Sequence, residues 1–443
     1  MSHPLPDKFI QRINNDSFFD SDFLAHLDSI PPVSVRFHPE KVQSKLEVLK
    51  AVSWCENAFY LKERPSFTLD PLFHAGGYYP QEAGSMILDT ILKQITLPED
   101  PVILDLCAAP GGKSTLIASF LNGKGMLVSN EVIQQRARIL RENIVKWGCT
   151  NTLVTCNDPA DFSRLPNFFD AIVVDAPCSG EGMFRKDKAA RDEWSEENVL
   201  LCAARQKRIL ADVWESLKPG GFLIYSTCTF NASENEENII WFCEEFGAEE
   251  VKLKMPVEIQ EGRGGRGHYC FPGINESEGF YVAVLQKPDE TFRNSKWNKR
   301  PEFRKQKESA GLEEFVRLDD TALYVWNERM LVLPAKMEAE MLHVQSLLRL
   351  LKMGTMVGEN SRKGLIPSEE LAMDFNLLSF PRKTELSRQD ALNYLHGDTF
   401  DLGEGNGFCL VTFEEQPLGW IKRVNKRFNN LYPKEWRIRM QIN

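Results

Sequence analysis

Short apolar runs alternate with stretches of helical spacing between about residue 98 and residue 287, and this alternation limits the fold more than any other feature of the chain. The pattern predicts strands and helices in turn. The predicted strands are 101–106, 125–131, 152–156, 170–175, 222–226 and 279–285, and the predicted helices are 114–121, 133–147, 198–217 and 234–246. Such alternation builds a parallel sheet covered by helices on both faces. We therefore expect an α/β core that binds ligands at the carboxyl ends of its strands.

The chain is long enough to form other domains around this core. Its 443 residues divide by their patterns into five segments. They are an N-terminal α/β extension with amphipathic helical stretches (1–97), the catalytic core (98–288), a basic linker (289–308), a mixed segment without a clear pattern (309–383), and a small β-rich domain (384–443).

Basic residues gather in two places although the net charge of the chain is −10. Seven lysines and arginines lie between Phe292 and Lys307, and seven more lie between Trp420 and Asn443, with aromatic residues among them in both patches. Such patches can neutralise phosphates while the whole protein stays acidic, and aromatic rings can stack on bases. The patches favour RNA as a partner. A solvated linker and a solvated surface face are the alternatives.

The ten cysteines form no Cys-x-x-Cys pair, and no histidine lies at zinc-finger spacing from a cysteine pair. We therefore expect neither a metal site nor a disulfide framework. No apolar run approaches the length that crosses a bilayer, and the first residues lack the basic and apolar regions of a secretory signal. These features predict a cytoplasmic protein with reduced thiols and no membrane partner.

A glycine-containing loop follows the first predicted strand of the core. Its sequence, Ala108-Ala-Pro-Gly-Gly-Lys-Ser-Thr115, is not a phosphate-binding P-loop, because Cys107 stands where that motif needs glycine. The loop opens a predicted helix, so its backbone can approach a small cofactor closely. Glu131 ends the second strand, where a carboxylate can bind ribose hydroxyls, and Asp158 follows the third strand, where it can face an adenine edge. A helix cap or a solvated acid is the alternative for each carboxylate, and S-adenosylmethionine competes with NAD as the cofactor.

Two cysteines directly follow predicted strands, Cys178 in Asp175-Ala-Pro-Cys-Ser-Gly and Cys228 in Ser-Thr-Cys-Thr. If both strands belong to one parallel sheet, both thiols emerge at its carboxyl edge, beside the glycine loop. A thiol can attack a substrate and split one difficult reaction step into two easier ones. The combination predicts covalent catalysis on a bound substrate. The residues alone do not tell which thiol attacks.

Three segments together resemble motifs of the RNA 5-methylcytosine methyltransferases of the Sun/RsmF family. They are Cys107-Ala-Ala-Pro-Gly-Gly-Lys113, Asp175-Ala-Pro-Cys-Ser-Gly-Glu-Gly182 and Ser226-Thr-Cys-Thr229, in this order and at similar spacing. The C-terminal Gly419-Trp, Asn430-Leu-Tyr-Pro and Trp436-Arg resemble the PUA-like tail of the RsmF branch. The resemblance implies a Rossmann-like core that depends on S-adenosylmethionine. It also implies that the PUA-like C-terminal domain and the N-terminal extension both bind RNA.

The resemblance also implies a role for individual residues. Cys228 would be the nucleophile that adds to C6 of a cytosine, Asp175 would bind the base and stabilise charge, and Cys178 would assist product release. S-adenosylmethionine would supply the methyl group. Its binding residues would be Cys107, Ala108, Ala109, Pro110, Gly111, Gly112, Lys113, Glu131, Arg136, Asp158 and Asp175.

The substrate implied by this family branch is RNA of the small ribosomal subunit (16S ribosomal RNA or the 30S subunit) and not DNA, and we expect a monomer. The target cytosine must be single-stranded or flipped out, since pairing hides its C6 face. The basic loop Gly262-Arg-Gly-Gly-Arg-Gly267 is predicted to hold RNA near the sheet edge, and His268 to be structural or an RNA contact. Transfer RNA remains an alternative substrate, and an RNA-binding assembly factor without activity an alternative function. An amino-group methyltransferase typically has Asp/Asn-Pro-Pro-aromatic where this chain has Asp175-Ala-Pro-Cys178.

Overall fold

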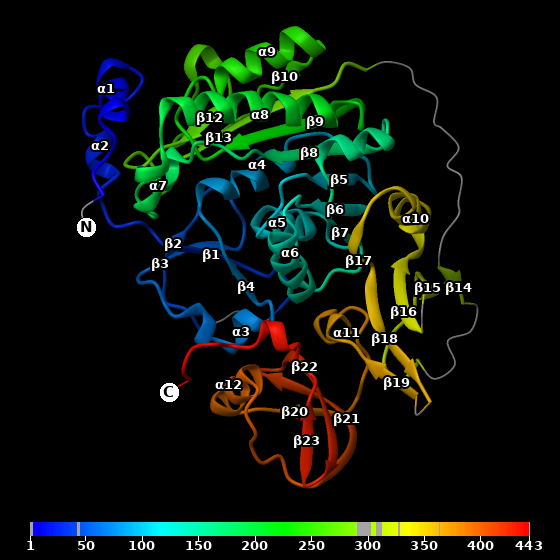
Figure 1. The fold of residues 1–443 in the computed structure, drawn as a ribbon. Helices are drawn as coiled ribbons and strands as arrows, with labels where there is room; N and C mark the ends of the chain where they lie inside the picture. Colours follow the sequence, from blue (N-terminus) through cyan, green and yellow to red (C-terminus); the bar gives the residue numbers. More distant parts are fainter. Residues whose placement is uncertain are drawn as a thin grey trace.

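The computed structural model describes residues 3–41, 45–289, 303–306, 312–326, 328–362 and 364–442. A ten-stranded sheet forms its largest part (Figure 1). Its strands are β5 (Val102–Asp105), β6 (Met126–Asn130), β7 (Thr152–Thr155), β8 (Phe169–Asp175), β9 (Leu217–Thr227), β10 (Glu249–Glu250), β11 (Gln260–Glu261), β12 (His268–Cys270), β13 (Phe280–Gln286) and β17 (Leu350–Met353). The strand order is β11-β12-β13-β9-β8-β5-β6-β7-β17, and β10 pairs with β13.

The centre of this sheet is parallel and confirms the expected α/β core. Strands β7, β6, β5, β8 and β9 run in the same direction, while β13 and β17 pair antiparallel at either side. The chain winds outward from β5 through β6 and β7, then returns to β8 on the other side of β5. Ligands bind open α/β sheets at such a reversal, beyond the carboxyl ends of the strands. Asp105 and Asp175 are the last residues of the two strands that flank it.

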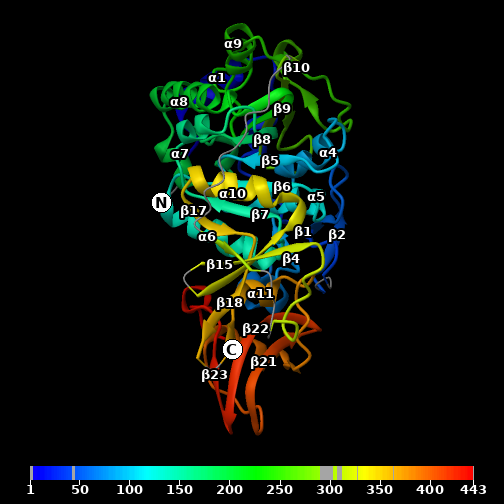
Figure 2. The same ribbon diagram turned by 90° about the vertical axis from the view of Figure 1, so that its right-hand side faces the viewer.

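Helices cover both faces of the sheet (Figures 1 and 2). They are α4 (Leu88–Leu92), α5 (Gly112–Leu121), α6 (Gln134–Trp147), α7 (Ala189–Glu193), α8 (Glu196–Trp214), α9 (Glu236–Phe246) and α10 (Glu338–Leu347). Because side chains alternate along a strand, Leu104 packs with α8, α9 and α10, whereas Ile103 packs with α4 and α5. Both residues are fully buried. The continuous apolar run of β5 therefore reflects burial on both faces.

The predicted helices and strands of the core are present, with shifted ends. Helix α8 begins at Glu196 because the side chain of Ser195 caps it by accepting the backbone N–H of Asn198. The residues Lys218-Pro-Gly-Gly221 belong to β9, which begins earlier than predicted and is irregular where it leaves α8. The sequence patterns missed the short strands β10, β11 and β12 and the edge strand β17, which comes from the mixed segment and pairs with β7.

The N-terminal segment contains a sheet together with helices, in agreement with the expected α/β extension. Its elements are α1 (Asp7–Asn15), α2 (Phe23–His26), β1 (Ser34–Phe37), β2 (Val48–Ala51), β3 (Ala58–Leu61), η1 (Phe67–Leu69), α3 (Pro71–His74), β4 (Tyr78–Pro80) and η2 (Gly84–Ile87). The four strands are antiparallel, in the order β2-β3-β1-β4. Helix α1 packs separately from this sheet: its Phe9 and Ile13 are buried in the same cluster as α8 and α9.

Two further sheets lie beyond the core. The first contains β14 (Arg304–Lys305), β15 (Thr321–Trp326), β16 (Arg329–Pro334), β18 (Thr355–Ser361) and β19 (Gly364–Pro367), and α11 (Glu369–Met373) follows it. The second contains β20 (Lys383–Glu385), β21 (Gly405–Phe413), β22 (Gln416–Asn425) and β23 (Arg427–Asn430), with α12 (Arg388–His396) beside it. The C-terminal sheet lies at the far end of the molecule from α8 and α9 (Figures 1 and 2). It is β-rich, as expected.

All ten cysteines lie in the described ranges, and none of them forms a disulfide. Among the helices of the described ranges, none is both long and apolar enough to span a bilayer. No cluster of three or more histidine, cysteine, aspartate or glutamate side chains in these same ranges is arranged to hold a metal ion.

Candidate active site

The glycine loop connects the end of β5 to the start of α5, at the winding reversal of the sheet. Gly111 precedes the first residue of α5 with φ at 119°, a backbone conformation that L side chains rarely adopt. The backbone N–H of Ala108 donates to the carbonyl of Asn130 at 2.8 Å, and the guanidinium of Arg136 donates to the carbonyl of Ala109 at 2.9 Å. The loop is therefore held to β6 and α6, with its backbone facing the sheet edge.

The N-terminal segment also holds this loop, which sequence reasoning missed. Arg36 of β1 is 3% exposed and donates to the Thr115 hydroxyl at 2.6 Å and to the carbonyl of Gly112 at 3.3 Å. Its guanidinium also lies 4.7 Å from the Trp147 ring centroid. The sequence does carry one signal, an arginine between the apolar Val35 and Phe37. A charge in an apolar strand indicates a buried partner.

A cavity of about 200 Å³ lies against the glycine loop. Asp105, Lys113 and Asp175 line it from the core, and residues 79–82 line it from the N-terminal segment. A larger cleft of about 1180 Å³ adjoins it, and four residues line both spaces: Pro80, Gln81, Glu82 and Lys186. The site therefore pairs a small recess with an open approach between the core and the N-terminal sheet.

Asp105 is the most deeply buried acid of the cavity, with 0% exposure. One carboxylate oxygen, Oδ2, accepts the Ser114 hydroxyl at 2.6 Å. The other, Oδ1, has no hydrogen-bond partner among the described residues. Burial raises the pKa of Asp105 to about 7, against the lowering effect of the Ser114 hydrogen bond. A buried acceptor without a partner beside the glycine loop fits a site that binds a polar ligand.

The raised pKa of Asp105 predicts a specific dependence of stability on pH. Between about pH 4 and pH 7 the folded state keeps a proton that the unfolded state has lost, so this group makes unfolding easier as the pH rises. Asp105→Asn removes the titration and preserves the acceptor for Ser114. We compare the free energy of unfolding of the variant with that of the unchanged protein at each pH. The variant's value minus that of the unchanged protein should increase by on the order of 4 kcal/mol from pH 4 to pH 7. Urea unfolding at four pH values measures it.

Asp161→Asn is the control, because Asp161 is a surface acid whose side chain is 41% exposed. Its difference from the unchanged protein should not follow the same pH course. A constant difference between Asp105→Asn and the unchanged protein from pH 4 to pH 7 would contradict the assignment of the raised pKa.

Asp175 and Lys113 bring the end of β8 to the glycine loop. The ammonium of Lys113 lies 2.7 Å from the Asp175 carboxylate, and the Ser226 hydroxyl donates to the other carboxylate oxygen at 2.8 Å. The Asp175 side chain is 36% exposed, so the carboxylate is oriented and still open to the cavity. Lys113 also lies 4.8 Å from the Phe280 ring centroid. The pair places one negative and one positive group at the mouth of the recess.

The structure brings the two predicted thiols together. The sulfur atoms of Cys178 and Cys228 lie 3.2 Å apart. Gly182 permits this approach, because a Cβ atom there would lie 2.7 Å from the carbonyl oxygen of Gly279 and 3.0 Å from that of Cys228. The hydrogen bond with Cys228, together with burial, raises the pKa of Cys178, so this thiol keeps its proton. Burial also raises the pKa of Cys107, a third thiol at the same edge, far above its usual range.

The remaining predicted cofactor residues differ in their placement. The Glu131 carboxylate is 4% exposed, accepts the backbone N–H of Ile133 at 2.9 Å and pairs with Arg136 at 3.2 Å, beside the glycine loop. Asp158 instead caps the short helix η3 (Pro159–Arg164) through the backbone N–H of Ala160 and pairs with Arg208. Glu131 and Arg136 thus join the glycine loop, whereas the Asp158 carboxylate takes the capping role considered from the sequence.

The arginines of the basic loop 262–267, which the sequence predicts to hold RNA, form ion pairs within the protein. Arg263 pairs with Asp16 at 2.6 Å and with Glu236 at 3.3 Å, and Arg266 pairs with Glu250 at 2.9 Å. Both guanidinium groups are committed within the protein, and the arginines therefore stabilise the packing of α1 and β10. Of the predicted basic patch 292–307, only 303–306 lie inside the described residues. The linker 289–308 lies mostly outside them.

Three family models match successive parts of the chain. They are the N-terminal domain of 16S rRNA methyltransferase RsmF (residues 5–83), 16S rRNA methyltransferase RsmB/F (residues 93–286) and the methyltransferase RsmF PUA domain (residues 381–438). Among solved structures, a methyltransferase homologue from Pyrococcus horikoshii covers 60% of this chain and 89% of its own, at 27% identity and TM-score 0.52. NSun6 from the same organism covers 64% and 99%, at 20% identity and TM-score 0.56, a likeness of fold.

Relatives over most of the chain carry one name. Ribosomal RNA small subunit methyltransferase F from Citrobacter koseri is 33% identical over 414 residues, which are 87% of this chain and 84% of the relative. The protein of that name from Aeromonas hydrophila is 34% identical over 411 residues, with 87% and 85% coverage. These matches agree with the glycine loop, the two thiols and the PUA-like tail. This chain belongs to the RsmF family of S-adenosylmethionine-dependent methyltransferases.

Proposed function

We propose that this protein transfers a methyl group from S-adenosylmethionine to C5 of a cytosine in small-subunit ribosomal RNA, through a covalent bond between Cys228 and C6. One observation carries the proposal: two sulfur atoms lie 3.2 Å apart, at the same sheet edge as Asp175 and the glycine loop. Amino-group or hydroxyl methylation needs no thiol. Addition to C6 is what makes C5 nucleophilic, so a thiol beside an anchoring carboxylate fits cytosine C5.

The residues at the glycine loop fit the cofactor. Residues 107–113 offer backbone groups, and the unpartnered Oδ1 of Asp105 offers an acceptor to a polar ligand. We assign Glu131 and Arg136 to the ribose side of this site, with Asp158 at its edge and Asp175 at the boundary with the base. When bound, S-adenosylmethionine supplies an electrophilic methyl group on a sulfonium. The protein's part is to hold the base next to it.

In the first step the Cys228 thiol gives its proton to solvent. The thiolate then adds to C6, which forms the S–C6 bond and moves an electron pair toward C5. Cys178 keeps its proton and lies within hydrogen-bond distance of the Cys228 sulfur, so it can stabilise that thiolate. The Asp175 carboxylate, oriented by Lys113 and Ser226, would accept the amino N–H of the cytosine. As the thiolate adds, the ring nitrogen N3 takes up a proton from solvent and can then donate to Asp175 as well, so no net negative charge builds up on the base.

Release reverses the covalent step. After C5 has gained the methyl group, its proton leaves to solvent and the electron pair of that C–H bond expels the Cys228 sulfur. The Cys178 S–H is placed to donate to the departing sulfur, which lowers the cost of the negative charge forming there. The 3.2 Å separation therefore supports a pair in which one thiol attacks and the other assists release. The resemblance of the two motifs to those of the family assigns attack to Cys228 and release to Cys178.

The RNA assignment is supported by the names of the relatives and by the shape of the site. A cleft of about 1180 Å³ adjoins the recess and meets it at residues 80–82. A base must leave its stack to reach Asp175 at the edge of the recess. We assign RNA binding to residues 1–97 and 384–443, and catalysis to 98–288. The protein would act as a monomer in the cytoplasm.

Purified protein with labelled S-adenosylmethionine tests this proposal on three RNAs: the small ribosomal subunit, deproteinised small-subunit RNA and total transfer RNA. Mass spectrometry of the digested nucleosides should find 5-methylcytosine in small-subunit RNA. Label in transfer RNA alone would move the substrate to that class. Methylated amino groups would overturn the C5 assignment. Binding of RNA and cofactor without any transfer would favour an assembly factor.

A further inference from the structure

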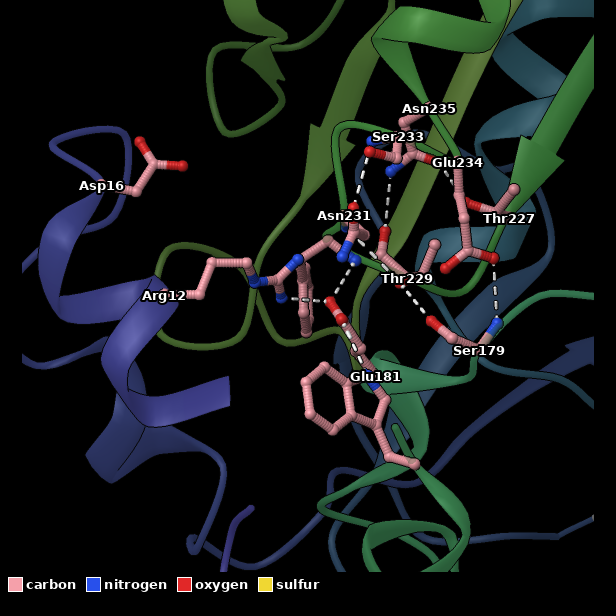
Figure 3. A network of polar contacts seen from close by, with 12 residues as sticks. Arg12, Asp16, Ser179, Glu181, Thr227, Thr229, Asn231, Ser233, Glu234 and Asn235 are labelled. Atoms are coloured by element: carbon pink, nitrogen blue, oxygen red, sulfur yellow. Dashed lines mark hydrogen bonds and ion pairs between the residues drawn. The ribbon is translucent and has the colours of Figure 1, made fainter. Parts of the chain in front are cut away.

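Two buried carboxylates lie on the loops that carry the thiols, and neither lines the cavity at the glycine loop or takes part in the proposed reaction. Figure 3 shows both. Glu181 follows Cys178 by three residues, and Glu234 follows Cys228 by six. Both side chains are 0% exposed. Carboxylates are rarely buried so completely without a requirement, because removing a charge from water is costly. Their contacts show what they do here.

The carboxylate of Glu181 crosses from the Cys178 loop to the Cys228 loop. Its Oε2 accepts the backbone N–H of Phe230, which follows Cys228 by two residues, at 3.1 Å. The same oxygen accepts the guanidinium of Arg12 at 2.7 Å, and Oε1 accepts the indole N–H of Trp194 at 3.0 Å. Figure 3 shows Arg12 reaching this carboxylate from α1. Both oxygens of the Glu181 carboxylate therefore accept hydrogen bonds.

The carboxylate of Glu234 crosses in the opposite direction. Its Oε2 accepts the backbone N–H of Ser179, the residue after Cys178, at 2.9 Å. It also accepts the amide N–H of Gln206 at 2.8 Å, and Gln206 donates to the carbonyl of Pro177 at 3.1 Å, on the other side of the thiol. The Oε1 atom has no partner among the described residues. Cys178 therefore lies between two backbone groups that Glu234 and Gln206 hold.

Two smaller contacts complete the connection between the loops. The hydroxyls of Ser179 and Thr229 lie 3.0 Å apart, and the backbone N–H of Gly182 donates to the carbonyl of Cys228 at 2.8 Å. The arrangement is reciprocal: a carboxylate from each thiol loop accepts a backbone N–H from the other. We propose that Glu181 and Glu234 are positioning residues that set the separation of Cys178 and Cys228, with Arg12 balancing the charge of Glu181.

The reaction explains why such positioning matters, and in this respect the inference rests on the proposed function. The Cys178 S–H must donate a hydrogen bond to the Cys228 sulfur in both steps, and such a bond tolerates little change in distance. A misplacement of about 1 Å can cost about 100-fold in rate. Arg12 belongs to α1, so the N-terminal segment also contributes to the spacing of the thiols.

The test measures the spacing of the thiols without RNA. Phenylarsine oxide binds two neighbouring thiols through its trivalent arsenic, with loss of one water, and Cys178→Ala gives the baseline for binding elsewhere. Glu181→Gln should weaken binding about 10-fold, because its amide N–H₂ must face either the Trp194 indole or the Arg12 and Phe230 donors. Glu234→Ala should weaken it similarly. Glu234→Gln should restore it, since one amide oxygen can accept from both Ser179 and Gln206.

Glu370→Gln is the matched control for a lost buried carboxylate. Glu370 accepts the guanidinium of Arg141 at 2.6 Å and the backbone N–H of Met356 at 3.1 Å, far from the thiols in the chain. This variant should lose stability and still bind phenylarsine oxide as the unchanged protein does. The cofactor affinity of all variants should stay within about threefold of the unchanged value, because the carboxylates do not line the cavity.

Binding of the arsenical at unchanged strength by Glu181→Gln and Glu234→Ala would overturn the proposal. If Glu181→Gln does not fold, Arg12→Met carries the same test, since it leaves the Glu181 charge without its cation while changing a side chain that is 29% exposed. Weakened arsenical binding with no methylation of any RNA by the unchanged protein would sustain the positioning role and reject the proposed function. The two can therefore fail separately.

Discussion

Replacing Cys228 with alanine is expected to lower the rate of 5-methylcytosine formation about 1000-fold or more. The variant lacks the only sulfur that can add to C6 in the proposed reaction, and without that addition C5 does not attack a methyl group. A 1000-fold loss corresponds to about 4 kcal/mol of transition-state stabilisation. Cys228 does not line the cavity at the glycine loop, so the cofactor should bind normally. Transfer rates and cofactor titration on the same preparation measure both.

Cys243→Ala is the control for this variant. Cys243 is another half-buried free thiol, on α9, and has no role in the proposed chemistry. Its activity should stay near that of the unchanged protein. A Cys228→Ala protein that binds the cofactor and keeps a tenth or more of the methylation rate would contradict the assignment of the nucleophile.

Replacing Cys178 with alanine is expected to trap the enzyme on ordinary RNA. The Cys228 thiolate can still add to C6, but the S–H that assists its departure is missing from its place 3.2 Å away. Loss of a positioned proton donor costs about 100- to 10,000-fold. Turnover should therefore fall by about 100-fold or more. A protein–RNA complex should survive denaturing electrophoresis even when the RNA contains only ordinary bases and no cytosine analogue.

The double variant Cys178→Ala/Cys228→Ala separates a covalent complex from tight binding, because it should form no complex that survives denaturation. If Cys178→Ala turns over freely and Cys228→Ala instead accumulates the complex, the two thiols have exchanged roles. The resemblance of the two motifs to those of the family favours the first outcome, because the contact between the two sulfur atoms is itself symmetric.

The parts of the fold that depend on local pattern could be predicted from the sequence. Strands such as β5 are buried on both faces and therefore read as continuous apolar runs, and α6 combines helical spacing with Gly148 in a left-handed conformation at its end. Parallel strands all end at one edge, so the convergence of Asp175, Cys178 and Cys228 followed from the order of the strands.

The parts that depend on distant partners could not be predicted. Strand β17 pairs with β7 across about two hundred residues of sequence, and β10 and β11 have only two residues each. Neither length nor periodicity marks such strands. The role of Arg36 depends on Thr115, and that of Glu181 depends on Arg12 and Phe230, so no local motif announces either contact.

Arg263 and Asp158 are two charged residues for which the sequence predicts contact with a ligand. In the structure both form contacts within the protein. Arg263 lies in a glycine-rich basic loop that suggested RNA, yet Asp16 and Glu236 bind its guanidinium. Asp158 follows β7, on the side predicted to face the adenine, and its carboxylate caps η3. Charge and position in the sequence show where such a group lies along the chain. The partner it meets depends on tertiary packing.

The identity of the attacking thiol is the central claim, and mass spectrometry of a trapped complex tests it most directly. RNA that carries 5-fluorocytosine at the target position cannot release the enzyme after methylation, because fluorine replaces the C5 proton that must leave. After nuclease and protease digestion, the peptide containing Cys228 should carry the mass of a methylated fluorocytidine nucleotide, and the Cys178 peptide should be unmodified. A nucleotide on Cys178, or methylation without any covalent complex, would contradict the account.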